Sequence, residues 1–307
     1  MAKQFKNYLN PLLKGENLSS SEMKSLMNLI MAGELGSAQI ASCIVALQIK
    51  GITSDEIACA ASVMREHSNK VNIKDCKYLI DTCGTGGDSL QTFNVSTLSA
   101  IVAAAAGAKV AKHGGRSVSS KCGSADVLET FGVNVNLDHK SLGKLVDAIG
   151  IGFMFAPNYH PAMKYVAPVR KELEVRTIFN LLGPLTNPAS AKRQIIGVYS
   201  KELTLTFAEV LKKLGSEHVL VVHGEDGMDE ISITGKTFIA ELKNNVINEY
   251  TIDPKMFNLK EGSLENIVVE DASHSKKMIL DILNGKLNVA RDITLLNAGA
   301  AIYISGL

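Results

Sequence analysis

The sequence has almost no net charge and no long hydrophobic run. Its 307 residues include 32 lysines and arginines against 31 aspartates and glutamates, which gives a formal net charge of +1 at pH 7. A chain so evenly balanced has no overall field that favours nucleic acid or an anionic membrane, so we expect neither as a partner. The longest apolar run, around residues 100–106, is far too short to span a bilayer.

The sequence also lacks the cysteine pairs and the leader that mark a secreted protein. Residues 1–15 contain no continuous apolar core and no small-residue cleavage site, so we expect no signal peptide. The five cysteines are scattered and form no CxxC pair, which is typical of reduced thiols and argues against a zinc site. Cys83 and Cys122 adjoin glycine-rich loops, where packing is favoured over a catalytic thiol. These features predict a cytoplasmic protein.

The order of the predicted elements indicates two domains. Residues 1–72 form a predicted helical domain, because apolar residues recur at helical spacing and two capping boxes mark helix starts. Over residues 73–307, short apolar runs that end in glycine-rich turns alternate with amphipathic segments, which predicts an α/β domain with a mostly parallel central sheet. A helical segment at about 160–190, punctuated by prolines, is expected to pack on the first domain. The capping boxes pair Ser19 with Glu22 and Thr53 with Glu56.

A glycine-rich loop follows the first predicted strand. The segment DTCGTGGDS, residues 81–89, contains three glycines whose backbone N–H groups can approach an anion without interference from a Cβ. Just beyond it, Asn94, Ser96 and Thr97 lie at a predicted helix N-terminus, where unpaired N–H groups and the helix dipole favour phosphate. The alternative is an ordinary strand-to-helix turn capped by Ser96.

A second loop of this kind follows the next predicted strand. Residues 110–126 place Lys112, His113 and Arg116 around two adjacent glycines, and a run of hydroxyl side chains comes after them. The alternative here is a polar turn with Lys112 and Arg116 in solvent. Because the carboxyl ends of parallel strands share one edge of a sheet, the two loops together predict a phosphate site at that edge.

A third predicted strand leads to a pair of acids. Residues 221–232 contain Asp229 beside Glu230, and Mg²⁺ usually bridges one or two carboxylates to the phosphates of a substrate. Taken alone, such a pair is more often a pair of exposed turn acids.

The proline-punctuated segment carries two arginines that could bind a carboxylate. Arg170 and Arg176 lie among apolar residues, and a guanidinium pairs well with a planar carboxylate. The alternative is an ion pair with Glu172 or Glu174. His160 is interpreted as structural, and no nucleophile–base arrangement stands out.

Six motifs in this order resemble those of the anthranilate phosphoribosyltransferase family, which belongs to the nucleoside-phosphorylase-like class III phosphoribosyltransferases. They are GTGGD (84–88), NVST (94–97), KHGGRSVSSKCGSAD (112–126), APVRKEL (167–173), RTIFNLLGPLTNP (176–188) and GMDEIS (227–232). The resemblance implies a small helical domain joined to a larger α/β domain, usually in a homodimer. It also implies transfer of phosphoribose from 5-phosphoribosyl 1-diphosphate (PRPP) to anthranilate in tryptophan biosynthesis, with Mg²⁺ as the cofactor.

The resemblance further implies roles for single residues. Those implied for PRPP are Gly84, Gly86, Gly87, Asp88, Thr92, Asn94, Ser96, Thr97, Lys112 and Ser124. Those implied for anthranilate are Gly84, His113, Gly115, Arg170 and Pro184, and those implied for Mg²⁺ are Ser96, Asp229 and Glu230. No general base is expected, because a neutral aromatic amine can react once it is well positioned.

The chain departs from the family pattern in three ways. Gly115 replaces an asparagine that touches anthranilate, Glu174 replaces a common glycine, and the chain ends sooner than most relatives. Three alternatives therefore stay open. They are a pyrimidine nucleoside phosphorylase, a PRPP transferase for another aromatic amine, and a non-enzymatic nucleic-acid-binding paralogue, which would need a basic surface.

Overall fold

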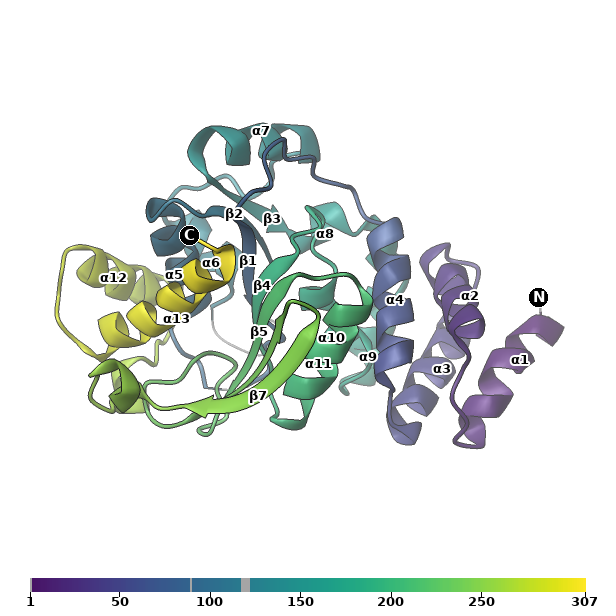
Figure 1. The fold of residues 1–307 in the computed structure, drawn as a ribbon. Helices are drawn as coiled ribbons and strands as arrows, with labels where there is room; N and C mark the ends of the chain where they lie inside the picture. The colour runs from purple at the N-terminus through teal and green to yellow at the C-terminus, as the bar shows by residue number, and fades with distance from the viewer. Residues whose placement is uncertain (1, 89, 117–121) are drawn as a thin grey trace. The chain divides into compact units, whose positions relative to one another are not determined.

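The computed structural model describes residues 2–88, 90–116 and 122–307, with side chains from residue 5 onward. The chain separates into two compact units (Figure 1). The first consists of Met1–Lys70 with Pro157–Pro188, and the second of Val71–Ala156 with Ala189–Leu307. No helix among the described residues is both long enough and apolar enough to cross a membrane.

The first unit is built from helices. Its N-terminal part contains α1 (Ala2–Leu13), α2 (Ser20–Met31), α3 (Ser37–Lys50) and α4 (Ser54–Glu66). Its second part, which α8 (Ala156–Tyr159) leads into, contains η1 (Pro161–Tyr165), α9 (Ala167–Leu173), α10 (Phe179–Leu182) and η2 (Gly183–Leu185). Both expected capping boxes are present at the starts of α2 and α4. Helix α9 contacts α3, and α10 contacts α4.

A buried ion pair joins three parts of this helical unit. Lys50 at the end of α3 lies 2.8 Å from Glu56 of α4, and both side chains are almost fully buried. Glu56 also accepts a hydrogen bond of 3.0 Å from the backbone N–H of Leu18, before α2. A buried charge is tolerated only when it is paired and hydrogen-bonded, and here both conditions are met.

The second unit is organised around a seven-stranded sheet in the order β3-β2-β1-β4-β5-β6-β7. The strands are β1 (Leu79–Gly84), β2 (Lys109–Gly114), β3 (Ile151–Phe155), β4 (Arg193–Gly197), β5 (His218–Gly224), β6 (Thr237–Lys243) and β7 (Val246–Ile252). Strands β3, β2, β1, β4 and β5 pair in parallel, and β6 and β7 add an antiparallel hairpin. The predicted mostly parallel sheet is confirmed.

Helices cover both faces of this sheet (Figure 1). Helices α5, α12 and α13 lie on one side together with α6, and α11 packs on β5 and β6 from the other. The helices and 3₁₀ turns are α5 (Val95–Ala105), α6 (Ser124–Thr130), α7 (His139–Ile149), α11 (Glu202–Lys213), η3 (Pro254–Phe257), η4 (Leu264–Asn266), α12 (Ala272–Leu283) and α13 (Val289–Ser305).

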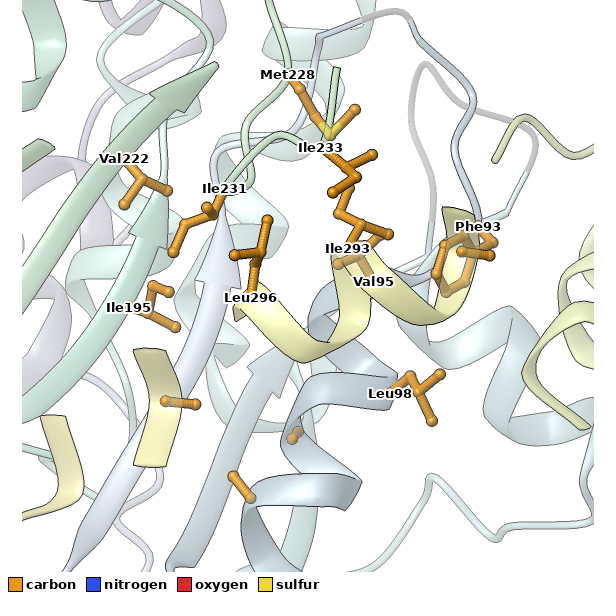
Figure 2. Close-up of a cluster of buried hydrophobic side chains, with 14 of the residues drawn as sticks. Phe93, Val95, Leu98, Ile195, Val222, Met228, Ile231, Ile233, Ile293 and Leu296 are labelled. Carbon is orange, nitrogen blue, oxygen red and sulfur yellow. The ribbon is translucent and has the colours of Figure 1, made fainter. Parts of the chain in front are cut away.

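The main core lies between the sheet and the helices α5 and α13 (Figure 2). Leu98 of α5 and Ile293 of α13 are fully buried, and Figure 2 shows Leu296 of α13 near Ile195 of β4 and Ile231 of the loop after β5. Burying a side chain of this size contributes roughly 1.5–3 kcal/mol. The core therefore reaches the loop that carries the predicted acid pair.

Candidate active site

Four strands end in glycine at the same edge of the sheet. Strands β1, β2, β4 and β5 end at Gly84, Gly114, Gly197 and Gly224, and their parallel pairing puts these ends side by side. The two glycine-rich loops and the acid pair follow three of these ends, as the sequence predicts. The hydroxyls of Ser117, Ser119 and Ser120, which belong to the second loop, lie outside the described residues.

The first loop closes around Asp229. The N–H of Gly86 donates a hydrogen bond of 2.8 Å to Asp229 Oδ2, and a Cβ at Gly84 would clash with that carboxylate. A Cβ at Gly197 would clash with the Asp229 backbone. Gly86 and Gly87 also have positive φ angles of 66° and 80°, a conformation that L side chains rarely adopt. The glycines are needed here because backbone and carboxylate approach so closely.

The N-terminus of α5 holds the second acid. The N–H of Ser96 donates to Glu230 Oε1 at 3.1 Å. Asn94, rather than Ser96, occupies the N-cap position of α5, so the Ser96 hydroxyl is not used as a cap. Ser96, Asp229 and Glu230, the residues expected to bind Mg²⁺, are thus gathered around one helix terminus and one glycine loop.

The surroundings of Asp229 and Glu230 disfavour the ionised forms of both carboxylates. Both side chains are partly buried, which does not fit the alternative of exposed turn acids. Burial raises the pKa of Asp229 to about 7, and the nearby charge of Asp88 adds to it. Burial and the charge of Asp229 raise the pKa of Glu230 to about 8. Crowded carboxylate oxygens of this kind fit a divalent cation, which would offset their charge.

Lys112 is buried beside these acids. Its side chain is only 3% exposed, so the alternative of a solvated lysine is wrong. Its ammonium donates a hydrogen bond of 3.0 Å to Ser96 Oγ and another to the backbone carbonyl of Thr82. Burial lowers the pKa of Lys112, while Asp81 is the largest opposing influence. Arg116, by contrast, is exposed and pairs with Asp126 and Glu129.

Two helix N-termini are tied together at the expected PRPP site. Thr97 of α5 donates a hydrogen bond of 3.1 Å from its hydroxyl to that of Ser124, the first residue of α6. The amide of Asn94 donates to the Cys122 carbonyl at 3.2 Å and accepts at 2.7 Å from Ser275 of α12. Ser275 is fully buried, and sequence reasoning missed it because its partner lies 181 residues away.

The remaining PRPP candidates lie along the loop between β1 and α5. Asp88 accepts a hydrogen bond of 3.2 Å from the N–H of Leu90 and lies close enough to Asp229 to raise its pKa. Thr92 forms an isolated antiparallel bridge with Val268. All ten residues expected for PRPP are therefore in the second unit, on or beside the same sheet edge.

The residues expected for anthranilate are divided between the units. His113 and Gly115 lie at the end of β2, where the His113 N–H donates to the buried Asp81 at 3.1 Å. Sequence reasoning gave Asp81 no role of its own. A Cβ at Gly115 would meet nothing within 4 Å, so the backbone here is not closely approached by other atoms as it is at Gly84.

Arg170 and Pro184 belong to the first unit. Arg170 is partly buried in α9, and burial lowers its pKa. Within the described part of the chain Arg170 has no ion pair with Glu172 or Glu174, the alternative suggested by the sequence. Pro184 is buried in η2.

The cysteines have the environment of packed thiols. All five are free, and only Cys76 is exposed. Burial raises the pKa of Cys122 to about 11 and the pKa of Cys83 well above its usual value. A reactive thiolate would need the opposite shift, so the interpretation of Cys83 and Cys122 as packing residues is favoured.

Comparison with known proteins finds matches over nearly the whole chain. Residues 77–307 match the α/β domain of a glycosyl transferase family, and residues 6–68 match the helical bundle domain of a glycosyl transferase family. Anthranilate phosphoribosyltransferase from Methylobacillus flagellatus is 55% identical over 299 residues, which cover 97% of this chain and 88% of that protein.

Solved structures show the same fold. Anthranilate phosphoribosyltransferase from Thermus thermophilus matches with a TM-score of 0.92 and 40% identity, over 97% of this chain and 89% of that one. The Saccharomyces cerevisiae enzyme in complex with PRPP and Mg matches with a TM-score of 0.90 and 29% identity, over 100% and 90% of the two chains. The yeast enzyme has also been solved with 4-fluoroanthranilate.

Proposed function

The chain belongs to the anthranilate phosphoribosyltransferases of the glycosyl transferase family, and we propose that it transfers phosphoribose from PRPP to the amine of anthranilate. One observation carries the proposal. A glycine loop, a helix N-terminus and two crowded carboxylates meet at one sheet edge, where Gly86 and Ser96 donate hydrogen bonds to Asp229 and Glu230. The relatives support this function and none of the three alternatives.

In the proposed reaction the amine nitrogen attacks the anomeric carbon of PRPP. The bond from that carbon to the diphosphate oxygen breaks, diphosphate leaves with the electron pair, and the new ammonium loses a proton to give N-(5-phosphoribosyl)anthranilate. The positive end of the α5 dipole would stabilise the negative charge that grows on diphosphate, while the N–H groups of Gly86 and Ser96 hold Asp229 and Glu230. The product belongs to tryptophan biosynthesis.

Magnesium would be held by Ser96, Asp229 and Glu230. The yeast relative is known in complex with PRPP and Mg. When bound, Mg²⁺ neutralises charge on the leaving diphosphate. Lys112 supports the same site by fixing the Ser96 hydroxyl, and Asn94, Thr97 and Ser124 hold the two helix N-termini that face the phosphates.

We assign the acceptor to His113, Gly115, Arg170 and Pro184, with Gly84 shared between the two substrates. The guanidinium of Arg170 is a suitable partner for the anthranilate carboxylate because it can form two parallel hydrogen bonds. We also propose the domain division expected from the sequence, a helical domain (1–72 with 160–190) and an α/β domain (73–307). A homodimer in the cytoplasm is the assembly and location expected of this family.

The deciding experiment follows the fluorescence of anthranilate with PRPP and Mg²⁺ present. We expect fluorescence to fall with time, and to stop falling when EDTA removes Mg²⁺. A parallel assay offers inorganic phosphate with a pyrimidine nucleoside, and another offers other aromatic amines with PRPP. If anthranilate is not consumed at saturating PRPP while another acceptor turns over, the assignment is wrong.

A further inference from the structure

We propose that Asn297 of α13 is a positioning residue that holds the acid pair Asp229–Glu230 in the geometry that Mg²⁺ requires. The proposal rests on the function proposed above. Its basis is a set of hydrogen bonds between α13 and the loop after β5, two segments 66 residues apart.

The amide of Asn297 bonds to both backbone groups of a single residue. Its Oδ1 accepts from the N–H of Ile231 at 2.9 Å, and its Nδ2 donates to the Ile231 carbonyl at 2.9 Å. The second hydrogen of Nδ2 goes to the carbonyl of Ile293, one turn earlier in α13, at 3.0 Å. The amide therefore has both donor hydrogens and its oxygen occupied by backbone.

This amide lies inside an apolar cluster. Asn297 is 1% exposed, and Figure 2 shows its helix neighbour Leu296 close to Ile231 and its helix neighbour Ile293 close to Ile233. An apolar side chain at this position would satisfy the helix equally well but would leave two buried backbone groups of Ile231 without a partner. The amide of Asn297 is therefore needed for the hydrogen bonding of the loop backbone and not for that of α13.

Ile231 is the residue directly after Glu230. The loop at residues 225–236 contains no helix or strand, and within the described residues the Ile231 backbone bonds only to Asn297. On the other side of the pair, the Asp229 backbone lies against Gly197. The two acids are therefore fixed between β4 on one side and Asn297 on the other.

Without this clamp, Glu230 and Asp229 would sample positions away from Ser96 and Gly86. Partners that orient metal ligands without touching the metal typically affect metal affinity by about 10- to 100-fold. We expect the effect to appear in Mg²⁺ binding and in PRPP binding, and to leave the affinity for anthranilate unchanged.

The test compares N297A with T294V. Thr294 lies one turn earlier in α13, is 2% exposed, and donates a hydrogen bond of 2.7 Å only to the Ala290 carbonyl of its own helix. Both variants lose buried hydrogen bonding in the same helix, but only N297A releases the loop. Calorimetric titration of Mg²⁺ into protein with PRPP present measures affinity without turnover, and steady-state rates give the Mg²⁺ requirement.

We expect N297A to weaken Mg²⁺ binding about 10-fold, with a KM for anthranilate within about twofold of wild type. T294V should bind Mg²⁺ as the wild type does, even if its Tm falls. Unchanged Mg²⁺ affinity in N297A, or an equal loss in T294V, would overturn the proposal. If N297A does not fold, N297S keeps a polar group for one side of Ile231 and is judged by the same criteria.

The calorimetric readout also separates this proposal from the function on which it rests. If the wild type binds Mg²⁺ with PRPP but does not consume anthranilate, the assigned acceptor is wrong. The difference between N297A and T294V then still decides whether Asn297 positions the acids.

Discussion

The ammonium of Lys112 donates a 3.0 Å hydrogen bond to the hydroxyl oxygen of Ser96, which links the end of β2 to the first turn of α5. Lys112 also donates to the Thr82 carbonyl, and the Thr82 hydroxyl in turn donates to the Ser96 carbonyl at 3.0 Å. Lys112, Thr82 and Ser96 form a closed network in which Lys112 and Thr82 are buried and Ser96 is partly buried. It orients the hydroxyl that is expected to face Mg²⁺.

Replacement of Lys112 by methionine should therefore damage the PRPP site. K112M keeps a long buried side chain but removes the donor to Ser96, so we expect kcat/KM for PRPP to fall by about 10²-fold, in line with losing a hydrogen bond from a charged group. The KM for anthranilate should change little. Steady-state kinetics with each substrate varied in turn makes the comparison.

The matched control is K50M in the helical unit. The Lys50 side chain is also almost fully buried, but it pairs with Glu56. Removing one partner of a buried pair is destabilising, so K50M should lower Tm while leaving kcat/KM for PRPP unchanged. A kcat/KM for PRPP in K112M equal to that of K50M would show that Lys112 only supports the fold.

The sheet edge was predictable because its signals are local. A strand that ends in glycine, followed by a helix start, is written in consecutive residues, as in Gly84–Asp88 and Asn94–Thr97. The parallel order of the strands then brings these loops together. The pair Asp229–Glu230 indicates a metal site only in combination with these loops.

The residues that support the site through distant hydrogen bonds could not be predicted from local sequence. Ser275 and Asn297 bond to segments 181 and 66 residues away, and nothing near either residue indicates its partner. An asparagine within the apolar stretch TLLNAGAAIYIS is unusual, but the sequence alone does not tell which backbone group it bonds to. Contacts of this kind depend on the packing of α12 and α13.

Gly115 allows a direct test of the acceptor site. A Cβ there would meet nothing within 4 Å, so we expect G115N to fold and to restore the amide typical of the family. If that amide bonds to anthranilate, a hydrogen bond of about 1 kcal/mol lowers the KM for anthranilate about fivefold. G115A adds the Cβ without the amide and should leave this KM near the wild-type value. An unchanged or higher KM in G115N would mean that the site compensates for the missing amide in another way.

Glu174 marks a second departure from the family, and its backbone explains the glycine common there. It follows the last residue of α9 with φ of 52°, in the left-handed conformation that favours glycine. Its side chain is exposed, so little packing is lost on its removal. We expect E174G to raise the free energy of unfolding by about 0.5–1 kcal/mol, measured by urea denaturation. E172G, inside α9, should lower it instead, and a loss of stability in E174G would contradict the strain argument.

His160 makes the stability of the helical unit depend on pH. It is 7% exposed, and burial lowers its pKa to about 4, with the charge of Lys70 contributing in the same direction. In the unfolded chain a histidine has a pKa of about 6.5, so between these values the unfolded state binds more protons. The contribution of His160 to the free energy of unfolding is therefore complete above about pH 6.5. It falls as the pH drops towards 4, by about 1.4 kcal/mol per pH unit at most.

The variant H160Q removes this titration and leaves the other ionisable groups in place. Between pH 7 and pH 4.5, we expect the free energy of unfolding of the wild type to fall by about 2–3 kcal/mol more than that of H160Q. Urea denaturation of both proteins at the two pH values measures it, and contributions from the carboxylates cancel in the comparison. Parallel pH dependence of the two proteins would show that His160 titrates normally in the folded state, because only a histidine held neutral by burial produces the difference.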